Sequence, residues 1–279
     1  MSDPSLFFLD LGPKSGRRRI AVRRTAGTEP GLLWLGGLKS DMQGTKAQAI
    51  GRWAETHEQA CVRFDYSGHG ESAGAFTDGT IGQWLEDAVA VFEGCCRGPQ
   101  ILIGSSMGGW IALLLTRLLR GRTIAGGARP ATIAGLVLIA PAVDFTETLM
   151  WEKFPRKVKR EMAEKGYWER PSAYGEEPYR ITHKLIEEGR NHLLLGDTVE
   201  TGCPIRILLG VQDPDVPWNH AVELVARIAR DDVVLTLVKD GDHRLSRPED
   251  LDRLLHAIRE LSNDIQTVTA TDSSSSPAV

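Results

Sequence analysis

Short apolar runs alternate with amphipathic stretches along most of the chain. The runs have the length of strands and are largely apolar, which is typical of strands buried on both faces of a parallel sheet. Between most of them, apolar residues recur with helical spacing. The pattern predicts strands at Leu32–Leu35, Cys61–Tyr66, Ile101–Gly104, Gly135–Ala140, Ile205–Gly210 and Val233–Val238. It predicts helices at Thr45–Thr56, Thr80–Phe92, Met107–Leu119, Asn219–Ala229 and Glu249–Leu261.

The first two segments, Leu6–Leu11 and Arg17–Arg24, have the pattern of a hairpin. We expect them to form an antiparallel edge on the sheet. The fold class that follows is α/β, with a mostly parallel, twisted sheet that carries helices on both faces.

Residues 143–199 break the alternation. They contain no strand pattern, but they hold helical stretches at Thr148–Glu164 and Tyr179–Gly189 and a dense share of the aromatic residues. We expect a helical lid over the carboxyl edge of the sheet, where open α/β folds place ligands. The core then comprises residues 1–142 and 200–264.

Two other segments lack an element pattern. Gly121–Ala134 is rich in glycine, alanine and arginine and predicts a flexible loop. Residues 265–279 include four consecutive serines and predict a disordered tail.

Composition and charge narrow the class of protein. With 33 basic and 37 acidic residues the net charge is −4, so we expect no nucleic-acid partner. No apolar run approaches 18 residues, so we expect no membrane span. The four cysteines show no metal-ligand spacing, and the start of the chain lacks the features of a secretory signal or transit peptide. We expect a cytoplasmic protein with free thiols and without metal or cofactor.

The strongest chemical signal is the sequence GSSMG at residues 104–108, which fits G-x-S-x-G. A predicted strand precedes it and a predicted helix follows, the context in which this motif places a nucleophilic serine on a strained turn. Ser106 has the required glycines two residues before and after it. Ser105 is the rival, but Ile103 and Met107 stand at its flanking positions.

A nucleophile of this kind needs two backbone N–H groups directed at the oxyanion. We expect one from Met107, directly after the serine, and the other from the loop after Leu32–Leu35. Gly36 and Gly37 allow that loop to turn inward, which makes the Leu38 amide our choice for the second donor.

The general base should follow the last strand, because the order in this fold is serine, acid, histidine. Among seven histidines, His243 alone stands on a polar loop directly after Val233–Val238. The acid should follow Ile205–Gly210, which favours Asp213. Asp215 is its rival on the same loop, and Asp144 occupies an alternative acid position after another strand.

Several stretches resemble one subgroup of hydrolases. They are GLKSDM from Gly37, CVRFDYSGHGES from Cys61 and GPQILIGSSMGGW from Gly98. They are similar to the family of α/β-hydrolase domain-containing protein ten, known in animals as mitochondrial palmitoyl-protein thioesterase and acyl-glucuronide esterase. The resemblance spans residues 34–261 and implies the α/β-hydrolase fold and esterase or thioesterase activity. The missing transit peptide suggests a bacterial or cytosolic member.

By this resemblance Ser106, Asp213 and His243 match the family's triad positions. We therefore expect a serine hydrolase that cleaves carboxylic esters or acyl thioesters, acting on small molecules or on S-acylated protein. Two alternatives remain open: a C–C bond hydrolase of ring-cleavage products, and a binding protein that uses the fold without turnover.

Overall fold

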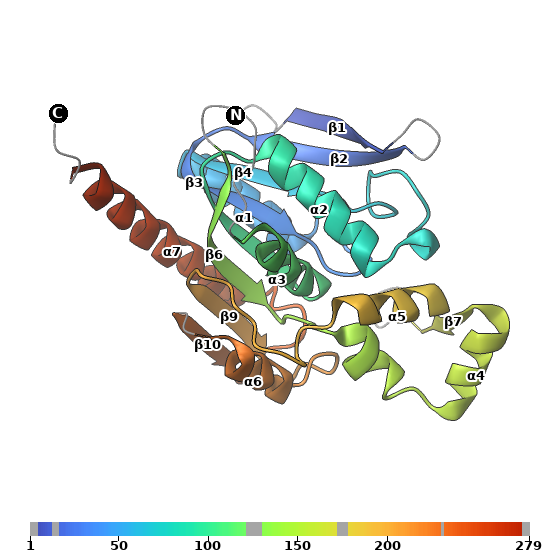
Figure 1. Ribbon diagram of the computed structural model, residues 1–279. Coiled ribbons are helices and arrows are strands. Elements are labelled where there is room, and N and C mark those ends of the chain that lie inside the picture. Colours follow the sequence, from blue (N-terminus) through green and yellow to red (C-terminus); the bar gives the residue numbers. More distant parts are fainter. Residues whose placement is uncertain (1–4, 13–16, 121–129, 172–177, 230–231, 275–279) are drawn as a thin grey trace.

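The computed structural model describes residues 5–12, 17–120, 130–171, 178–229 and 232–274. Its centre is an eight-stranded sheet in the order β1-β2-β4-β3-β5-β6-β9-β10 (Figure 1). The strands are β1 Ser5–Leu11, β2 Arg18–Thr25, β3 Thr28–Leu35, β4 Gln59–Phe64, β5 Pro99–Ser105, β6 Thr132–Ile139, β9 Ile205–Gly210 and β10 Val233–Val238. β1 and β2 form the expected antiparallel edge, and every pairing from β4 to β10 is parallel. The predicted α/β fold class is confirmed.

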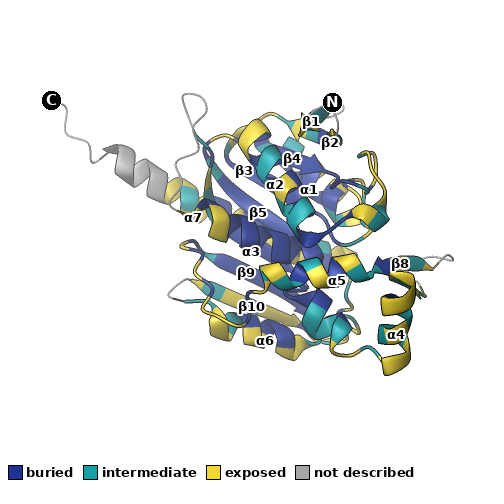
Figure 2. Ribbon diagram, turned by 45° about the vertical axis from the view of Figure 1, so that its right-hand side comes forward, coloured by how far each residue is buried: buried dark blue, intermediate teal, exposed yellow. Residues whose placement is uncertain are grey.

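Helices cover both faces of this sheet. They are α1 Thr45–Thr56, α2 Ile81–Cys95, α3 Met107–Leu119, α6 Trp218–Arg227 and α7 Pro248–Ser274. One core cluster joins the sheet to α2, α3 and α6, and the other joins it to α1 and α7. Alternation along β5 explains the two layers: Leu102 packs into the first cluster, and Ile101 and Ile103 pack into the second. The central strands β5 and β6 are buried over most of their length and less so where they begin (Figure 2).

The expected disordered tail is wrong for residues 265–274, because α7 continues to Ser274 (Figure 1). Ile265 packs against the second core cluster, and the Gln266 side chain donates to the backbone carbonyl of Glu29. These contacts extend the helix past the point at which its apolar spacing ends. Residues 275–279 lie outside the described part of the chain.

The loop expected at Gly121–Ala134 overlaps the start of a strand, so its predicted end was also wrong. β6 begins at Thr132, where the Thr132 amide donates to the carbonyl of Gly98 and Pro99 pairs with the strand. Residues 121–129 of that loop lie outside the described residues.

Residues between β6 and β9 differ most from expectation. The expected helical stretches contain most of η3 Thr146–Trp151, nearly all of α4 Arg156–Lys165 and all of α5 His183–Gly189, and a further turn, η4 Arg190–His192, follows them. Two strands were not expected: β7 Tyr167–Arg170 and β8 Tyr179–Thr182 pair as an antiparallel hairpin. The prediction that this insertion lacks strands was therefore wrong. Gly166 takes a left-handed conformation with φ of 81°, which ends α4 and turns the chain. Trp168 then pairs with Ile181 across the hairpin, a residue combination that favours strands.

Among the helices of the described residues, none combines the length and the apolar character that crossing a membrane would need.

The four cysteines are free and buried, as expected for small core residues.

Candidate active site

Ser106 stands on a sharp turn between β5 and α3. Its φ of 55° and ψ of −117° are strained for a residue with a side chain. The turn is fixed on both sides, because the Ser106 amide donates to the Ile139 carbonyl at 2.8 Å and the Ser106 carbonyl accepts from Ala142 at 3.1 Å. The strain presents the hydroxyl at the carboxyl edge of the sheet.

The glycines on either side of Ser106 allow this turn to pack. A Cβ on Gly104 would lie 2.4 Å from the carbonyl oxygen of Gly108. A Cβ on Gly108 would lie 2.0 Å from the Leu35 carbonyl oxygen. The motif spacing therefore reflects direct contact of α3 with the ends of β3 and β5.

His243 and Asp213 complete a hydrogen-bonded chain that begins at Ser106. His243 Nε2 lies 3.0 Å from Ser106 Oγ, and His243 Nδ1 lies 2.7 Å from Asp213 Oδ2. The Asp213 side chain is fully buried, and the His243 side chain is 15% exposed. With its proton on Nδ1, the imidazole donates to Asp213 and accepts from the Ser106 hydroxyl. This arrangement can remove the hydroxyl proton and hold the resulting imidazolium.

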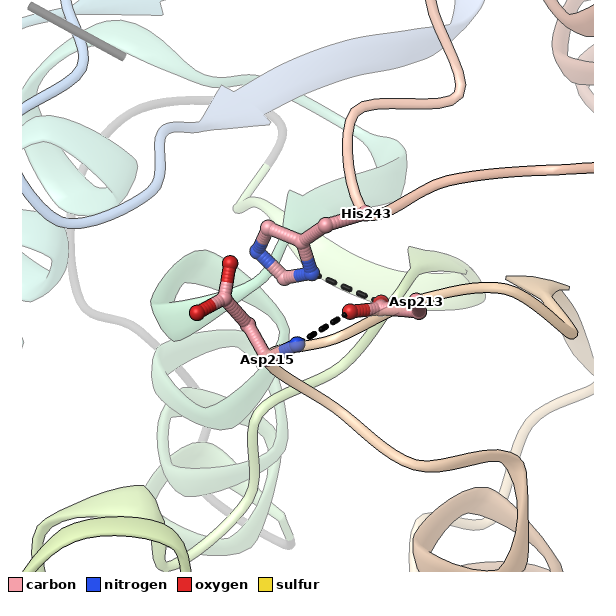
Figure 3. Close-up of side chains that lie close together, drawn as sticks. All are labelled: Asp213, Asp215 and His243. Carbon is pink, nitrogen blue, oxygen red and sulfur yellow. Dashed lines mark hydrogen bonds and ion pairs between the residues drawn. The ribbon is translucent and has the colours of Figure 1, made fainter. Parts of the chain in front are cut away.

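The loop after β9 holds Asp213 in place. The second carboxylate oxygen of Asp213, Oδ1, accepts hydrogen bonds from the backbone amides of Asp215 and Val216, both at 2.8 Å. Figure 3 shows Asp213 facing one ring nitrogen of His243, while the carboxylate of Asp215 lies on the other side of the ring. The structure therefore places Asp213, rather than Asp215, against Nδ1.

Both rival acids have other partners. Asp215 forms an ion pair with Arg170 of β7, with 3.0 Å between nitrogen and oxygen. Asp144 is buried and accepts from the amides of Leu194 and Leu195, which fastens the end of the insertion to the core. Burial raises the pKa of Asp144. Neither carboxylate orients the imidazole.

The expected oxyanion donors both lie beside Ser106. Met107 is the first residue of α3, where backbone N–H groups have no carbonyl partner within the helix. Among the described residues, no group accepts a hydrogen bond from the Leu38 amide. A Cβ on its neighbour Gly37 would lie 3.4 Å from Ser106 Cβ, which shows how closely this loop approaches the serine.

A cavity of about 770 Å³ opens at this edge of the sheet. Ser106 and His243 line it, together with both expected oxyanion residues. One wall comes from the insertion and includes Phe145, Leu149 and Met150. The lid itself stays a prediction, but the insertion does supply this apolar wall.

Two residues near the site gave no recognisable signal in the sequence. Asp65 is buried after β4 and accepts from the amides of Met42 and Glu71, so it joins the loop that carries Leu38 to the neighbouring loop. Burial raises the pKa of Asp65 to about 6. Lys46 of α1 lines the cavity, and its Nζ donates to the carbonyl of Arg244, the neighbour of His243. Only their positions in the fold reveal these contacts.

Asp213, Asp215 and His243 also form a group whose ligand atoms all lie within 4.8 Å of one another, close enough to hold a metal (Figure 3). Each already has a partner: the first two bind His243 and Arg170, and the imidazole bridges Asp213 and Ser106. The hydrogen bonds account for the positions of all three, and we assign no metal to them.

Comparison with known proteins supports the same assignment of family. A model described as "Alpha/beta hydrolase family" matches residues 34–254. Mitochondrial palmitoyl-protein thioesterase ABHD10 from Bos taurus is 37% identical over 250 residues, covering 89% of this chain and 78% of that protein.

Solved structures agree with this comparison. The chain resembles a putative hydrolase from Agrobacterium vitis with 46% identity and a TM-score of 0.89, covering 94% of this chain and 100% of that one. It resembles mouse α/β hydrolase domain-containing protein 10 with 33% identity and a TM-score of 0.82, covering 94% and 99%. The chain therefore belongs to the α/β-hydrolase family and is a relative of ABHD10.

Proposed function

We propose that this protein is a serine hydrolase that cleaves carboxylic esters or acyl thioesters through an acyl-enzyme intermediate. The observation that carries the proposal is the hydrogen-bonded chain from Ser106 through His243 to Asp213 at the cavity. The relationship to a palmitoyl-protein thioesterase supports acyl transfer as the reaction class.

In the first half of the cycle, His243 Nε2 takes the proton of the Ser106 hydroxyl while its oxygen attacks the acyl carbonyl carbon. The amides of Leu38 and Met107 stabilise the oxyanion. The tetrahedral intermediate then collapses, the bond from the acyl carbon to the leaving oxygen or sulfur breaks, and His243 returns the proton to that atom.

In the second half, His243 takes a proton from water and the hydroxide attacks the acyl-enzyme. Collapse of the second intermediate releases the carboxylic acid and restores the Ser106 hydroxyl. Asp213 stays ionised throughout and stabilises the imidazolium.

The acyl chain binds against the apolar wall of the cavity in this proposal. Phe145 and Met150 are buried and Leu149 is partly exposed, so together they offer an apolar surface next to Ser106. Acyl esters, acyl thioesters and S-acylated proteins all present such a chain, and they are the substrates we propose.

Hydrolysis of p-nitrophenyl esters and acyl thioesters by wild type and Ser106→Ala tests the proposal. Loss of the nucleophile should lower kcat on the order of 10⁴-fold or more. Ser105→Ala is the matched control and should stay within about tenfold of wild type, since Ser105 is the buried neighbour whose flanks do not fit the motif. Equal rates for Ser106→Ala and wild type would refute the proposal.

A further inference from the structure

A strained turn follows His243 on the loop after β10. Leu245, two residues further on, has a left-handed φ of 41° although it carries a bulky side chain. That side chain is 3% exposed and packs in the second core cluster. A backbone conformation of this kind persists only where the surrounding structure holds it. The contacts that hold this turn therefore also fix the chain that carries His243.

Two side chains hold the turn, one from inside the loop and one from outside it. Asp242 Oδ1 accepts from the amides of Arg244 and Leu245, both at 3.0 Å. From outside the loop, the Nζ of Lys46 donates to the backbone carbonyl of Arg244 and lies 3.4 Å from Ser246 Oγ. Lys46 thus contacts the residues on both sides of Leu245. Asp242 shapes the loop locally, whereas Lys46 ties it to another element of the fold.

That element is α1, which begins directly after the loop that carries Leu38. Lys46 stands in its first turn. The helix is fixed on the sheet, because one of its faces is fully buried in the second core cluster through Ala47, Ile50 and Ala54. The hydrogen bond from Lys46 therefore relates the loop of the base to the loop of an oxyanion donor.

The Lys46 amine is well suited to this contact. Burial lowers the pKa of Lys46 to about 8, so at pH 7 the amine is protonated and has three N–H groups to donate. A hydrogen bond from a charged donor is stronger than one between neutral groups. Lys46 and Ser246 also line the cavity, so the contact lies at the edge of the site itself.

We propose that Lys46 is a positioning residue for His243: its amine holds the turn at Leu245 and so keeps Nε2 within reach of the Ser106 hydroxyl. This inference rests on the proposed serine hydrolase function and adds a residue to its mechanism. His243 transfers protons in both halves of the cycle, so a displaced ring slows whichever half limits the rate. The loss should therefore fall on kcat rather than on KM.

Lys46→Met tests the role, because methionine keeps the apolar stem and lacks the donor. With p-nitrophenyl butyrate at pH 7, kcat should fall on the order of tenfold and KM should stay within about twofold of wild type. Lys46→Arg still donates and should recover most of the loss. Lys184→Met is the matched control. Its Nζ also donates to a distant backbone carbonyl, that of Asp78 at 3.0 Å, but outside the cavity lining, so kcat should not change.

Chemical rescue adds a readout that a merely structural role would not change. Lys46→Ala lacks the atoms from Cγ to Nζ, which propylammonium replaces, and the cavity gives this ion access. Propylammonium should restore kcat of Lys46→Ala with saturation and should leave wild type and Lys184→Ala unchanged. Trimethylpropylammonium carries the charge without an N–H group and should restore nothing.

Three results would overturn the positioning role: a kcat of Lys46→Met within about twofold of wild type, a loss that appears in KM alone, or equal effects of the two ammonium ions on Lys46→Ala. The second result would assign Lys46 to substrate binding instead. Each leaves the serine hydrolase standing, because wild type still cleaves the ester and Ser106→Ala does not. Equal activity of Ser106→Ala and wild type would instead refute the proposed function itself.

Discussion

The sheet core and the insertion between β6 and β9 meet at one cavity, but they contribute to it in different ways. The core provides Ser106, His243 and Asp213 from the ends of three strands, on turns fixed by backbone hydrogen bonds. The insertion provides Phe145, Leu149 and Met150 from a turn of π-helix and its start, and Arg170 and Tyr179 from a small hairpin.

The difference lies in what positions the side chains. In the core, Gly108 allows α3 to contact the Leu35 carbonyl directly, so the place of Ser106 depends on contacts that tolerate no added atom. In the insertion, α4 has one buried residue, Met162, and is otherwise largely exposed. This contrast suggests that the core determines the chemistry and the insertion determines which acyl chain is accepted.

The largest effect should come from the acid of the core. Asp213→Asn should lower kcat on the order of 10⁴-fold, because the amide no longer holds the imidazole in the required tautomer. Asp215→Asn should lower kcat by less than about tenfold, since that carboxylate pairs with Arg170 rather than with Nδ1. Steady-state kinetics on one p-nitrophenyl ester compares the two variants. A greater loss in Asp215→Asn would reverse our assignment of the acid.

A smaller effect should follow from adding one methyl group to the nucleophile turn. Gly108→Ala places a Cβ against the carbonyl oxygens of Leu35 and Gly36, at 2.0 and 2.6 Å. Relief of this clash should cost about 1–3 kcal/mol of unfolding free energy and move the loop that carries Leu38. Urea denaturation measures the stability. Gly196→Ala is the control, because nothing lies within 4 Å of its added Cβ. Equal stability of the two variants would show that the turn is less tightly packed than the structure indicates.

The smallest effect should come from the wall that the insertion supplies. Leu149→Ala removes apolar surface next to Ser106 and should lower kcat/KM about tenfold for long acyl chains, with little change for acetyl esters. Leu193→Ala, an exposed residue of the same insertion outside the cavity lining, should change neither. A series of p-nitrophenyl esters of graded length gives the comparison. An equal loss for short and long chains would assign Leu149 a role in the core chemistry instead.

The core and the insertion also differ in how well the sequence predicted them. Ile205–Gly210 and Val233–Val238 are strands with the predicted bounds, because each is a short, largely apolar run between two helical stretches. The insertion was predicted less well. Tyr179–Thr182 was expected as helix because its apolar spacing fits both periods, and the pairing with Tyr167–Arg170 that makes it a strand is not a local property.

The sequence by itself determined the fold class, the nucleophile turn and the order of the catalytic candidates. These follow from local features: a glycine spacing that the tight turn requires, and polar residues placed directly after apolar strands. The tertiary structure decided between Asp213 and Asp215, because the two carboxylates share one loop and differ in which side of His243 they face. It also brought Lys46 of α1 to Arg244, which lies 198 residues further along the chain. Contacts of this kind depend on how separate elements pack, and no local pattern records them.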